Sequence, residues 1–452
     1  MVHQVDALGQ QPSLNLYTQL TLCYPVHDDS AHGIGSVVST LNNGLKRLAT
    51  QVPWTAGEVV VEGNPPLSII KPIAEIPTVV VKDLRNDPTA PSWRTLENAE
   101  FPMSLMDENM LCPRNTIPGT PGEPTSRPTF VVQATLVKGG LLLSFVGQHQ
   151  VMDMIGQDVA MELLNRACHH EEVPSADLDN ANVARERIIP MLDDSQKTGQ
   201  EDQFTTPAAP VSDPALDTPT APVATPPPPP TSWVYFSFDQ TSLTSLKAVA
   251  SETVTSGFVS TDDSLCALIW QSIMKARSAR LAATDEAIFS RAVDMRRALG
   301  MEPKYPGVVQ NMSNTTLEIG QIVSEPLGVV ASRLRGSLGK KSLAEETIAM
   351  ATLLHRTDDK SVIQPLSSLN LSADMMLSSW SKVDGCWHMD FNMGLGKPVA
   401  VRRPRFAPFA SLMYLMPKSP SGEVSAAICL IDEDMDRLKT DKEFLKYGRY
   451  IG

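Results

Sequence analysis

The sequence predicts a protein of the α/β class with two domains, each built from strands and helices. At 452 residues the chain is too long for one ordinary hydrophobic core. Segments with strand and helix periodicity occur on both sides of its middle, and a proline-rich segment separates them. We therefore expect domains at residues 1–194 and 232–452, joined by a linker at residues 195–231.

In the N-terminal half, strand and helix patterns follow one another. Residues 14–25 alternate apolar and polar side chains, which predicts a half-buried strand. Residues 37–52 have helical spacing, with one apolar face to cover a sheet. Short β-like segments at 58–62 and 78–82 lie among proline- and glycine-rich turns.

The clearest local prediction is a β-hairpin at residues 129–148. Two apolar segments flank Lys138-Gly139-Gly140, which can adopt the positive backbone angles of a tight turn. From Val151 onward the apolar residues lie near one helical face. The second strand of the hairpin should therefore end just before a helix.

The C-terminal half repeats this alternation after the run Pro226 to Pro230, which favours extended polyproline geometry. Residues 232–238 predict a strand and residues 243–254 a helix. Ser260 and Thr261 are well suited to cap a further helix. Residues 289–296 predict a strand, and residues 378–380 and 390–398 read as β-like, with Gly394 free to adopt an unusual turn.

Composition restricts the classes of partner. The formal net charge of −13 argues against nucleic acid and anionic membrane as partners and favours small molecules or proteins. The longest aliphatic segment, residues 141–146, is too short to span a bilayer, and the N-terminus lacks the pattern of a signal peptide. We expect a cytoplasmic protein whose six scattered cysteines are reduced.

His149 is the candidate catalytic base, because it lies between the second hairpin strand and the following helix. Its spacing from Asp153 is common by chance and carries little weight alone. A second titratable cluster, His169-His170-Glu171-Glu172, suits a solvated helix end. We expect no metal site there, because no third ligand follows with recognisable spacing.

The order of four short motifs adds to this picture. They are His149-x-x-x-Asp153, Val293-Asp-x-Arg296, Ser379-Trp380 and Asp390-Phe-x-x-Gly394. This set resembles the BAHD family of acyl-CoA-dependent acyltransferases. Longer segments, among them LNLYTQLTLCYPV, GQHQVMDMIGQD, YPGVVQNM and VRRPRF, are similar to the fungal trichothecene 3-O-acetyltransferases of that family.

The resemblance implies two domains related to chloramphenicol acetyltransferase, with an active-site channel between them. Acetyl-CoA would be the co-substrate and a small-molecule alcohol the acceptor, in a monomeric enzyme without metal. His149 would take the proton from the acceptor hydroxyl. Asp153 would hold the histidine loop, through a charge pair with Arg291 or another nearby arginine.

The resemblance also implies supporting residues. Asp390 would pair with Arg296, so that the loop at Gly394 keeps its shape. Contacts to CoA are expected from Ser260, Thr261, Ser379 and Trp380. The family's second motif has Trp where this chain has Met393, which removes a side-chain N–H donor. Backbone N–H groups at residues 392–394 are one alternative donor for an oxyanion, and a nearby hydroxyl is another.

Several alternatives remain open at this point. The default acceptor is the 3-hydroxyl of a trichothecene, in biosynthesis or self-protection. Another terpenoid or polyketide alcohol, an amine, or a longer acyl donor fits the same motifs. The Met393 departure also allows a binding protein without turnover. Residue types alone allow a metal-dependent hydrolase that uses His149, Asp153 and His169 or His170.

Overall fold

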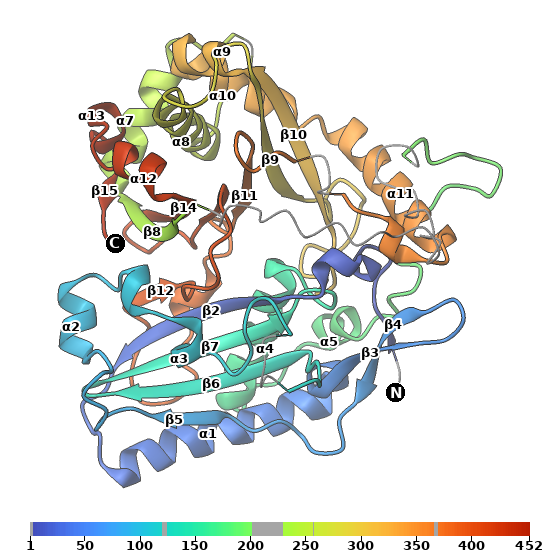
Figure 1. The fold of residues 1–452 in the computed structure, drawn as a ribbon. Helices are drawn as coiled ribbons and strands as arrows, with labels where there is room; N and C mark the ends of the chain where they lie inside the picture. Colours follow the sequence, from blue (N-terminus) through green and yellow to red (C-terminus); the bar gives the residue numbers. More distant parts are fainter. Residues whose placement is uncertain (1–2, 120–123, 201–228, 256, 366–368) are drawn as a thin grey trace, which may run out of the picture.

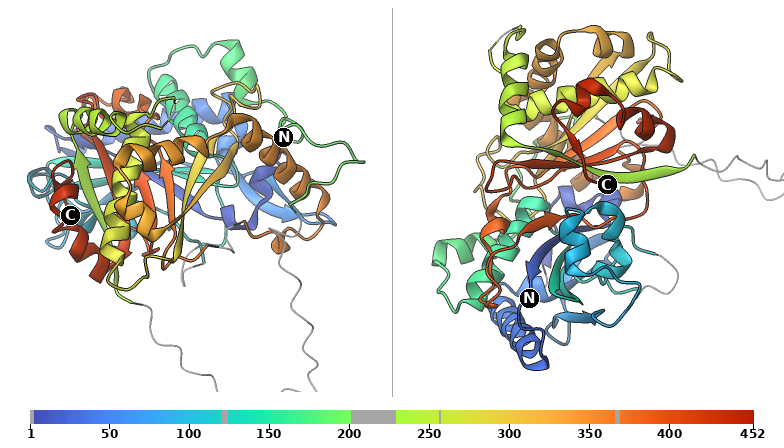
Figure 2. Two further views of the ribbon diagram at one scale, coloured as in Figure 1. Left: turned by 90° about the horizontal axis from the view of Figure 1, so that it is seen from above. Right: turned by 90° about the vertical axis from the view of Figure 1, so that its left-hand side faces the viewer.

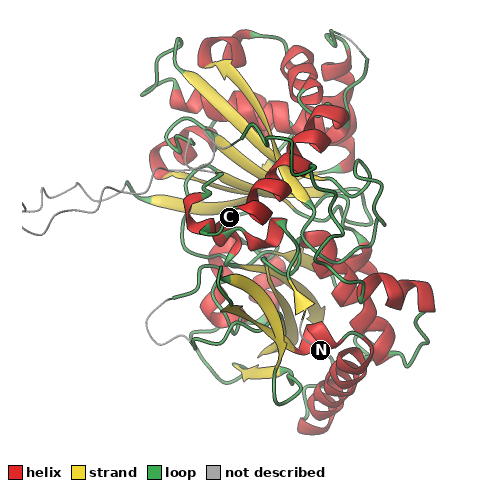
Figure 3. Cartoon of the chain, turned by 90° about the vertical axis from the view of Figure 1, so that its right-hand side faces the viewer, coloured by secondary structure: helices red, strands yellow, loops and turns green. Residues whose placement is uncertain are grey.

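The structure, a computed structural model, describes residues 3–119, 124–200, 229–255, 257–365 and 369–452. Two halves of the chain lie one above the other, and each contains a sheet covered by helices (Figure 1 and Figure 3). The predicted α/β class with mixed sheets is confirmed, because both main sheets contain parallel and antiparallel pairs. Most of the expected linker, residues 201–228, lies outside the described residues, so the domain boundaries stay a prediction.

The N-terminal half is organised around β7, which is buried along its whole length. It pairs with β2 on one side and β6 on the other, and the β6–β7 pair confirms the predicted hairpin. A strand covered on both faces needs apolar side chains throughout, as the sequence of this segment has. Within the described residues the sheet order is β12 (Ala400–Arg402), β2 (Tyr17–Pro25), β7 (Gly140–Gln148), β6 (Phe130–Val137) and β5 (Val80–Asp83).

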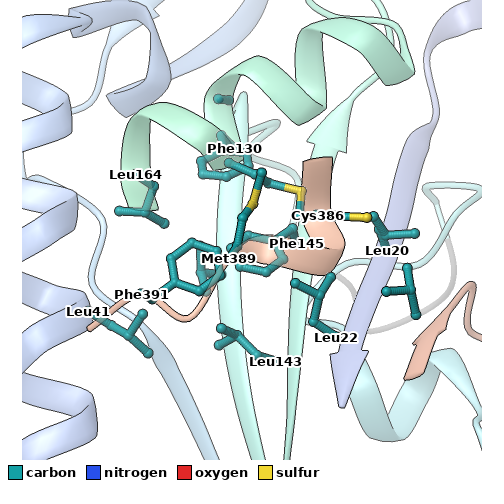
Figure 4. Close-up of a cluster of buried hydrophobic side chains, with 14 of the residues drawn as sticks. Leu20, Leu22, Leu41, Phe130, Leu143, Phe145, Leu164, Cys386, Met389 and Phe391 are labelled. Carbon is teal, nitrogen blue, oxygen red and sulfur yellow. The ribbon is translucent and has the colours of Figure 1, made fainter. Parts of the chain in front are cut away.

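The C-terminal part of the chain completes this N-terminal half. Strand β12 pairs with β2, so that Val401 lies opposite Leu22. The segment before β12 enters the same core, where the ring of Phe391 stacks on Phe145 with centroids 5.2 Å apart. Figure 4 shows Cys386, Met389 and Phe391 among side chains of the N-terminal strands and helices. One hydrophobic core therefore contains residues from both ends of the sequence.

Helices α1 (Ala31–Gln51) and α4 (Met154–Cys168) pack together in the N-terminal half. α1 begins six residues before the expected start, because Ser30 caps it by accepting a hydrogen bond from the N–H of Gly33 at 3.1 Å. The remaining N-terminal elements are a small sheet of β1 (His3–Gln4), β4 (Leu67–Pro72) and β3 (Gly57–Glu62), and the helices α2 (Trp93–Asn98), α3 (Glu108–Leu111) and α5 (Ser175–Ala181).

The C-terminal half contains a larger mixed sheet. Within the described residues its order is β10 (Gln310–Glu318), β9 (Glu286–Asp294), β11 (Met375–Ser379), β13 (Leu412–Leu415), β14 (Val424–Ile431), β8 (Thr231–Phe238) and β15 (Arg449–Tyr450). Its helices are α7 (Gln240–Ser251), α8 (Thr261–Arg277), α9 (Ile319–Ser324), α10 (Leu327–Gly336), α11 (Lys340–Arg356), α12 (Asp432–Leu438) and α13 (Lys442–Leu445).

Two sequence-based expectations for this half have different outcomes. The cap at α8 is confirmed, because Ser260 and Asp263 form a reciprocal capping box. The β-like reading of residues 390–398 is wrong, because the segment forms turns. Phe391, Asn392 and Gly394 all have positive φ angles, which no strand accommodates.

The two halves meet at a junction, which the right-hand view of Figure 2 shows from the side. The C-terminal residue lies at this junction. The carbonyl of Gly452 accepts hydrogen bonds from the N–H groups of Met103 and Tyr235, at 2.9 and 3.1 Å.

Across the described residues, every helix lacks the combination of length and apolar character that a membrane span requires.

Candidate active site

His149 lies directly after the central strand β7 and before α4. Its N–H donates to the carbonyl of Leu16 at 2.8 Å, which extends the pairing between β2 and β7. Its side chain lines a cavity of about 1020 Å³ between the two halves. The rigid strand thus presents the imidazole at the junction, as the sequence predicted.

The hydrogen bonding of His149 defines which ring nitrogen can act as a base. Its Nδ1 lies 3.1 Å from the carbonyl oxygen of Met152, which can only accept a hydrogen bond. Nδ1 therefore carries the proton of the neutral ring, and Nε2 keeps a free lone pair. Burial lowers the pKa of His149 and so favours this neutral form.

Asp153 holds the histidine loop through contacts to three segments. It caps α4 by accepting from the N–H of Gly156 at 3.0 Å, and it accepts from the N–H of Val309 at 3.0 Å. Arg296 Nη2 donates to the same carboxylate at 2.9 Å, and both side chains are buried. Burial opposes the positive charge of Arg296, but the carboxylates of Asp153 and Asp294 outweigh this effect and raise its pKa.

The pairing expected between Asp153 and Arg291 is wrong, because Arg291 lies in the C-terminal half beside α8. Its Nη1 donates to Asp263 at 3.1 Å, so Arg291 holds the capped start of α8. The alternative that another arginine pairs with Asp153 is correct, and that arginine is Arg296. Arg291 lies within β9 and Arg296 lies two residues after its end, so the two are close in sequence and periodicity could not tell their partners apart.

The pairing expected between Asp390 and Arg296 is also wrong. Asp390 Oδ1 lies 2.5 Å from Nε2 of His169, which follows the C-terminal end of α4. Asp153 lies at the other end of this 15-residue helix, about 22 Å away at 1.5 Å per residue. Partial burial opposes ionisation of Asp390, but the Asn392 N–H and His169 together lower its pKa.

The loop that follows Asp390 docks on the N-terminal half and has no place in the cavity wall. The N–H of Phe391 donates to Asn165 Oδ1 at 2.8 Å, and the amide of Asn392 donates to the carbonyl of Cys168 at 3.2 Å. The N–H of Met393 donates to the carbonyl of Asp390 at 3.1 Å. Residues 390–394, including Gly394, are absent from the cavity lining. Met393 is therefore a buried packing residue here, and no backbone N–H of residues 392–394 belongs to the lining of the cavity that contains His149.

The sequence reasoning missed a second buried carboxylate that holds the loop at residues 305–309. Asp6 accepts from the hydroxyl of Tyr305, from the N–H of Val308 at 3.0 Å and from Arg185 at 3.4 Å. Burial raises the pKa of Asp6, although Arg185 and the hydrogen bonds from Tyr305 and Val308 act to lower it. The segment YPGVVQNM, which supports the family resemblance, contains this loop. Its partner Asp6 lies 299 positions before Tyr305, and no local sequence pattern marks Asp6 as a partner of the loop.

The cavity is lined from both halves of the chain. Apolar and aromatic side chains form one part of the lining, and polar side chains of β9, β10 and the start of α11 form another. The first group includes Leu16, Met312, Phe406, Phe409, Leu412 and Tyr414, and the second includes Ser290, Gln310, Asn311, Ser313, Asn314 and Ser342. The volume fits a drug-sized ligand, and the mixed lining suits an apolar molecule with several oxygen atoms.

The four expected CoA-binding residues lie close together at the start of α8. Ser260 is engaged in the capping box, and Ser379 donates to Asp262 of α8 at 2.9 Å. Thr261 is the first residue of the helix. Trp380, which follows Ser379, lines the cavity, whereas the other three do not. Their contact with CoA stays a prediction.

The histidines near the end of α4 have partners that explain them without a metal. His169 contacts Asp390, and His170 Nδ1 lies 3.0 Å from Arg47. Among the described residues, no group of three or more His, Cys, Asp or Glu side chains is placed to hold a metal ion. All six cysteines are free and buried.

Comparison with protein families gives two matches. Residues 16–168 match the trichothecene 3-O-acetyltransferase-like N-terminal domain, and residues 108–445 match the Transferase family. The chain is 46% identical over 460 residues to the trichothecene 3-O-acetyltransferase TRI101 of Fusarium sporotrichioides, covering 99% of this chain and 97% of the relative. It is 43% identical over 459 residues to the O-acetyltransferase dmxR13 of Cryptosporiopsis sp., with the same coverage.

Solved structures agree with these matches. The structure of F. graminearum TRI101 in complex with coenzyme A and deoxynivalenol has a TM-score of 0.92 and 42% identity, and each chain covers 100% of the other. Vinorine synthase shares the fold, with a TM-score of 0.67 at 18% identity over 98% of this chain and 93% of its own. With His149 in a cavity between two mixed-sheet halves, the chain belongs to the Transferase family of acyl-CoA-dependent O-acyltransferases, the BAHD family.

Proposed function

We propose that this protein transfers acetyl from acetyl-CoA to the free 3-hydroxyl of a trichothecene. The observation that carries the proposal is the free Nε2 of His149 at the wall of a cavity large enough for such an acceptor. Relatives at 46% and 41% identity are named trichothecene 3-O-acetyltransferases, which supports this acceptor. We propose further that the enzyme is a cytoplasmic monomer, and that Ser260, Thr261, Ser379 and Trp380 line the path of CoA.

The reaction follows from the tautomer of His149. Nε2 accepts the proton of the acceptor hydroxyl while its oxygen forms a bond to the thioester carbonyl carbon. The carbonyl π electrons move to the oxygen and give a tetrahedral oxyanion. When this oxyanion collapses, the C–S bond breaks, and the leaving thiolate of CoA takes the proton from the imidazolium. Ester and free CoA are the products, and His149 returns to its neutral form.

Asp153 and Asp390 take different parts in this proposal. Asp153 keeps the His149 loop and the 305–309 loop together, so it acts through position and not by proton transfer. Asp390 stabilises the turn at residues 391–394, where it meets the far end of α4. Arg296 and Arg291 are structural, each paired with a buried carboxylate. Their charges are therefore satisfied within the protein.

An acceptor panel tests the proposal. Purified protein and acetyl-CoA are incubated with a trichothecene that bears a free 3-hydroxyl, and free thiol release is followed together with the product mass. The matched control is the same trichothecene already acetylated at position 3. We expect thiol release and a product about 42 Da heavier, because one acetyl group replaces one hydrogen atom, only with the free hydroxyl. Equal release with both compounds, or none with either, contradicts the assigned acceptor.

A further inference from the structure

A buried arginine without a role so far forms part of the cavity wall. The side chain of Arg403 is 1% exposed, and its guanidinium lies over the rings of Phe406 and Tyr414, 4.5 Å from each centroid. A third ring, that of Trp380, lies 5.5 Å away. All three rings line the cavity that contains His149, as does Arg403 itself. The charge is therefore set in the aromatic wall of the reaction cavity.

The charge of Arg403 lacks a carboxylate partner within the described residues. Three other buried arginines each pair with one: Arg277 with Asp434, Arg291 with Asp263 and Arg296 with Asp153. The guanidinium of Arg403 donates to the hydroxyl of Thr116 at 3.3 Å, and its Nε has no hydrogen-bond partner in the described part of the chain. The buried carboxylate of Glu108 lies on the other side of Thr116, where it accepts from the N–H of Thr116 at 2.6 Å and from the amide of Gln19 at 2.8 Å. Within the described residues it forms no ion pair with Arg403. A buried cation without an ion pair favours an anion in the adjoining cavity.

Arg402 shows that a buried arginine in this segment can have its hydrogen bonds satisfied within the protein. It is also buried, and its guanidinium lies 5.1 Å from the ring of Tyr235. Its three nitrogens donate to the carbonyls of Phe101, Val401 and Glu100, at 3.1, 3.1 and 3.2 Å. Arg402 does not line the cavity. The neighbouring arginines therefore differ in partners and in access to the reaction site.

The backbone of Arg403 is held firmly, which keeps the charge in place. The hydroxyl of Tyr235 donates to the carbonyl of Arg403 at 2.9 Å and lies 2.7 Å from its N–H. Arg403 follows β12, the strand that joins the N-terminal sheet. The crossover of the C-terminal chain thus delivers a fixed cation to the cavity, and fixed charges stabilise a transition state without reorganisation.

We propose that Arg403 provides electrostatic stabilisation in acyl transfer, because its fixed charge stabilises the oxyanion that forms on the acyl carbonyl oxygen. This inference rests on the acyl transfer at His149 described above, whichever alcohol is the acceptor. No new bond or co-reactant is involved, because the carbonyl π electrons move to the oxygen as before. Because Arg403 has no carboxylate partner among the described residues, its charge is available to stabilise this oxyanion.

The surroundings of His149 support this placement. Burial is the largest influence and lowers the pKa of His149. The charge of Arg403 lowers it further, whereas the Met152 carbonyl and the Asp153 carboxylate raise it. Arg403 therefore acts on the base before any substrate binds, by disfavouring a second positive charge in the cavity. Removal of this charge should allow protonation of His149 at higher pH.

The test compares Arg403→Met with Arg402→Met. Each variant removes one buried guanidinium and keeps an unbranched side chain, and thermal unfolding checks that each variant is folded before its rates are compared. For Arg403→Met we expect kcat to fall by roughly 10- to 100-fold, and the acidic limb of the kcat/KM profile to move up by roughly 0.5 to 1 pH unit. For Arg402→Met we expect neither change. A folded Arg403→Met protein with the kcat and acidic limb of the unmodified protein overturns the proposal.

Two further measurements keep the outcome decisive. Arg403→Lys retains a charge, so its acidic limb should stay where the unmodified protein has it, even if Arg403→Met does not fold; an upward move of that limb overturns the charge argument. Titration of His149 by NMR, assigned with His149→Asn, requires no acceptor. An upward shift of its pKa in Arg403→Met is expected even if no trichothecene is acetylated, which separates this inference from the choice of acceptor.

Discussion

At the scale of single residues, the proposed chemistry depends on which nitrogen of His149 carries the proton. The hydrogen bond from Nδ1 to the Met152 carbonyl keeps Nε2 unprotonated, and burial disfavours the charged ring. A base that is neutral at rest can accept the proton of an alcohol at the moment of attack. Asp153 contributes through the loop it holds, since its carboxylate is directed to Arg296 and two backbone N–H groups.

We expect His149→Ala to lower kcat by roughly 100-fold or more, because the general base is lost. Binding of CoA should change little, since the backbone of residue 149 continues the pairing of β2 and β7. Thiol release gives kcat, and titration calorimetry with CoA gives the affinity. A variant with near-normal turnover contradicts the role of His149.

We expect the kcat/KM profile to remain high below the ordinary pKa of histidine, about 6.5. In the proposed mechanism neutral His149 is the active form, and its lowered pKa keeps this form populated as the pH falls. Rates measured from pH 5 to 8 at low acceptor concentration report the free enzyme. An acidic limb above pH 6.5 is inconsistent with a lowered pKa of His149.

At the scale of elements, helix α4 links the site to the rest of the fold. Its N-terminal end carries Asp153 and packs against the 305–309 loop, while His169 after its C-terminal end meets Asp390 of the crossover segment. A carboxylate at the start of a helix and a histidine at its end both suit the helix dipole. Helix α4, which follows His149, therefore contacts C-terminal segments at both ends, namely the 305–309 loop at its start and Asp390 at its end.

We expect Gly156→Ala to lower stability and kcat together. An added Cβ would lie 2.0 Å from the carbonyl oxygen of Pro306, so α4 and the 305–309 loop would have to separate. The matched control is Gly35→Ala in α1, where an added Cβ meets nothing within 4 Å. The control should be neutral or stabilising, by up to about 1 kcal/mol from helix propensity. Thermal unfolding and initial rates measure both variants, and equal behaviour of the two would falsify the close packing at Gly156.

We expect Arg296→Met to lower the free energy of unfolding by about 3–5 kcal/mol, because the buried carboxylate of Asp153 loses its ionic partner. Asp390→Asn should lower the free energy of unfolding by no more than about 1 kcal/mol, because the pair with His169 is partly exposed to solvent. Its kcat should not change. Denaturant unfolding compares the two, and a larger loss for Asp390→Asn contradicts their relative burial.

At the scale of the whole molecule, the crossover of the C-terminal chain makes the two halves interdependent. Strand β12 covers the edge of β2, and Phe391 fills the core between Phe145 and α4. The same crossover places Arg403 beside the cavity. The site is therefore assembled from both halves, although its base comes from the first.

We expect residues 1–200 expressed alone to aggregate, since the edge of β2 and the site of Phe391 would be exposed. Co-expression with residues 229–452 should restore soluble protein that binds CoA. Size-exclusion chromatography and thermal unfolding provide the readout. Cooperative unfolding of the isolated N-terminal fragment as a monomer contradicts the interdependence of the halves.

The sequence by itself determined the α/β class, the hairpin, the position of His149 between strand and helix, and the cap at Ser260. These features follow from periodicity and from short-range side-chain hydrogen bonds, which local sequence contains. Only the tertiary structure decided that Asp153 pairs with Arg296, that Asp390 meets His169, that β12 joins the N-terminal sheet, and that Arg403 lies in the cavity wall with no carboxylate partner among the described residues. Such pairings join residues 143 and 221 positions apart, and no period or spacing along the chain specifies which charges will meet.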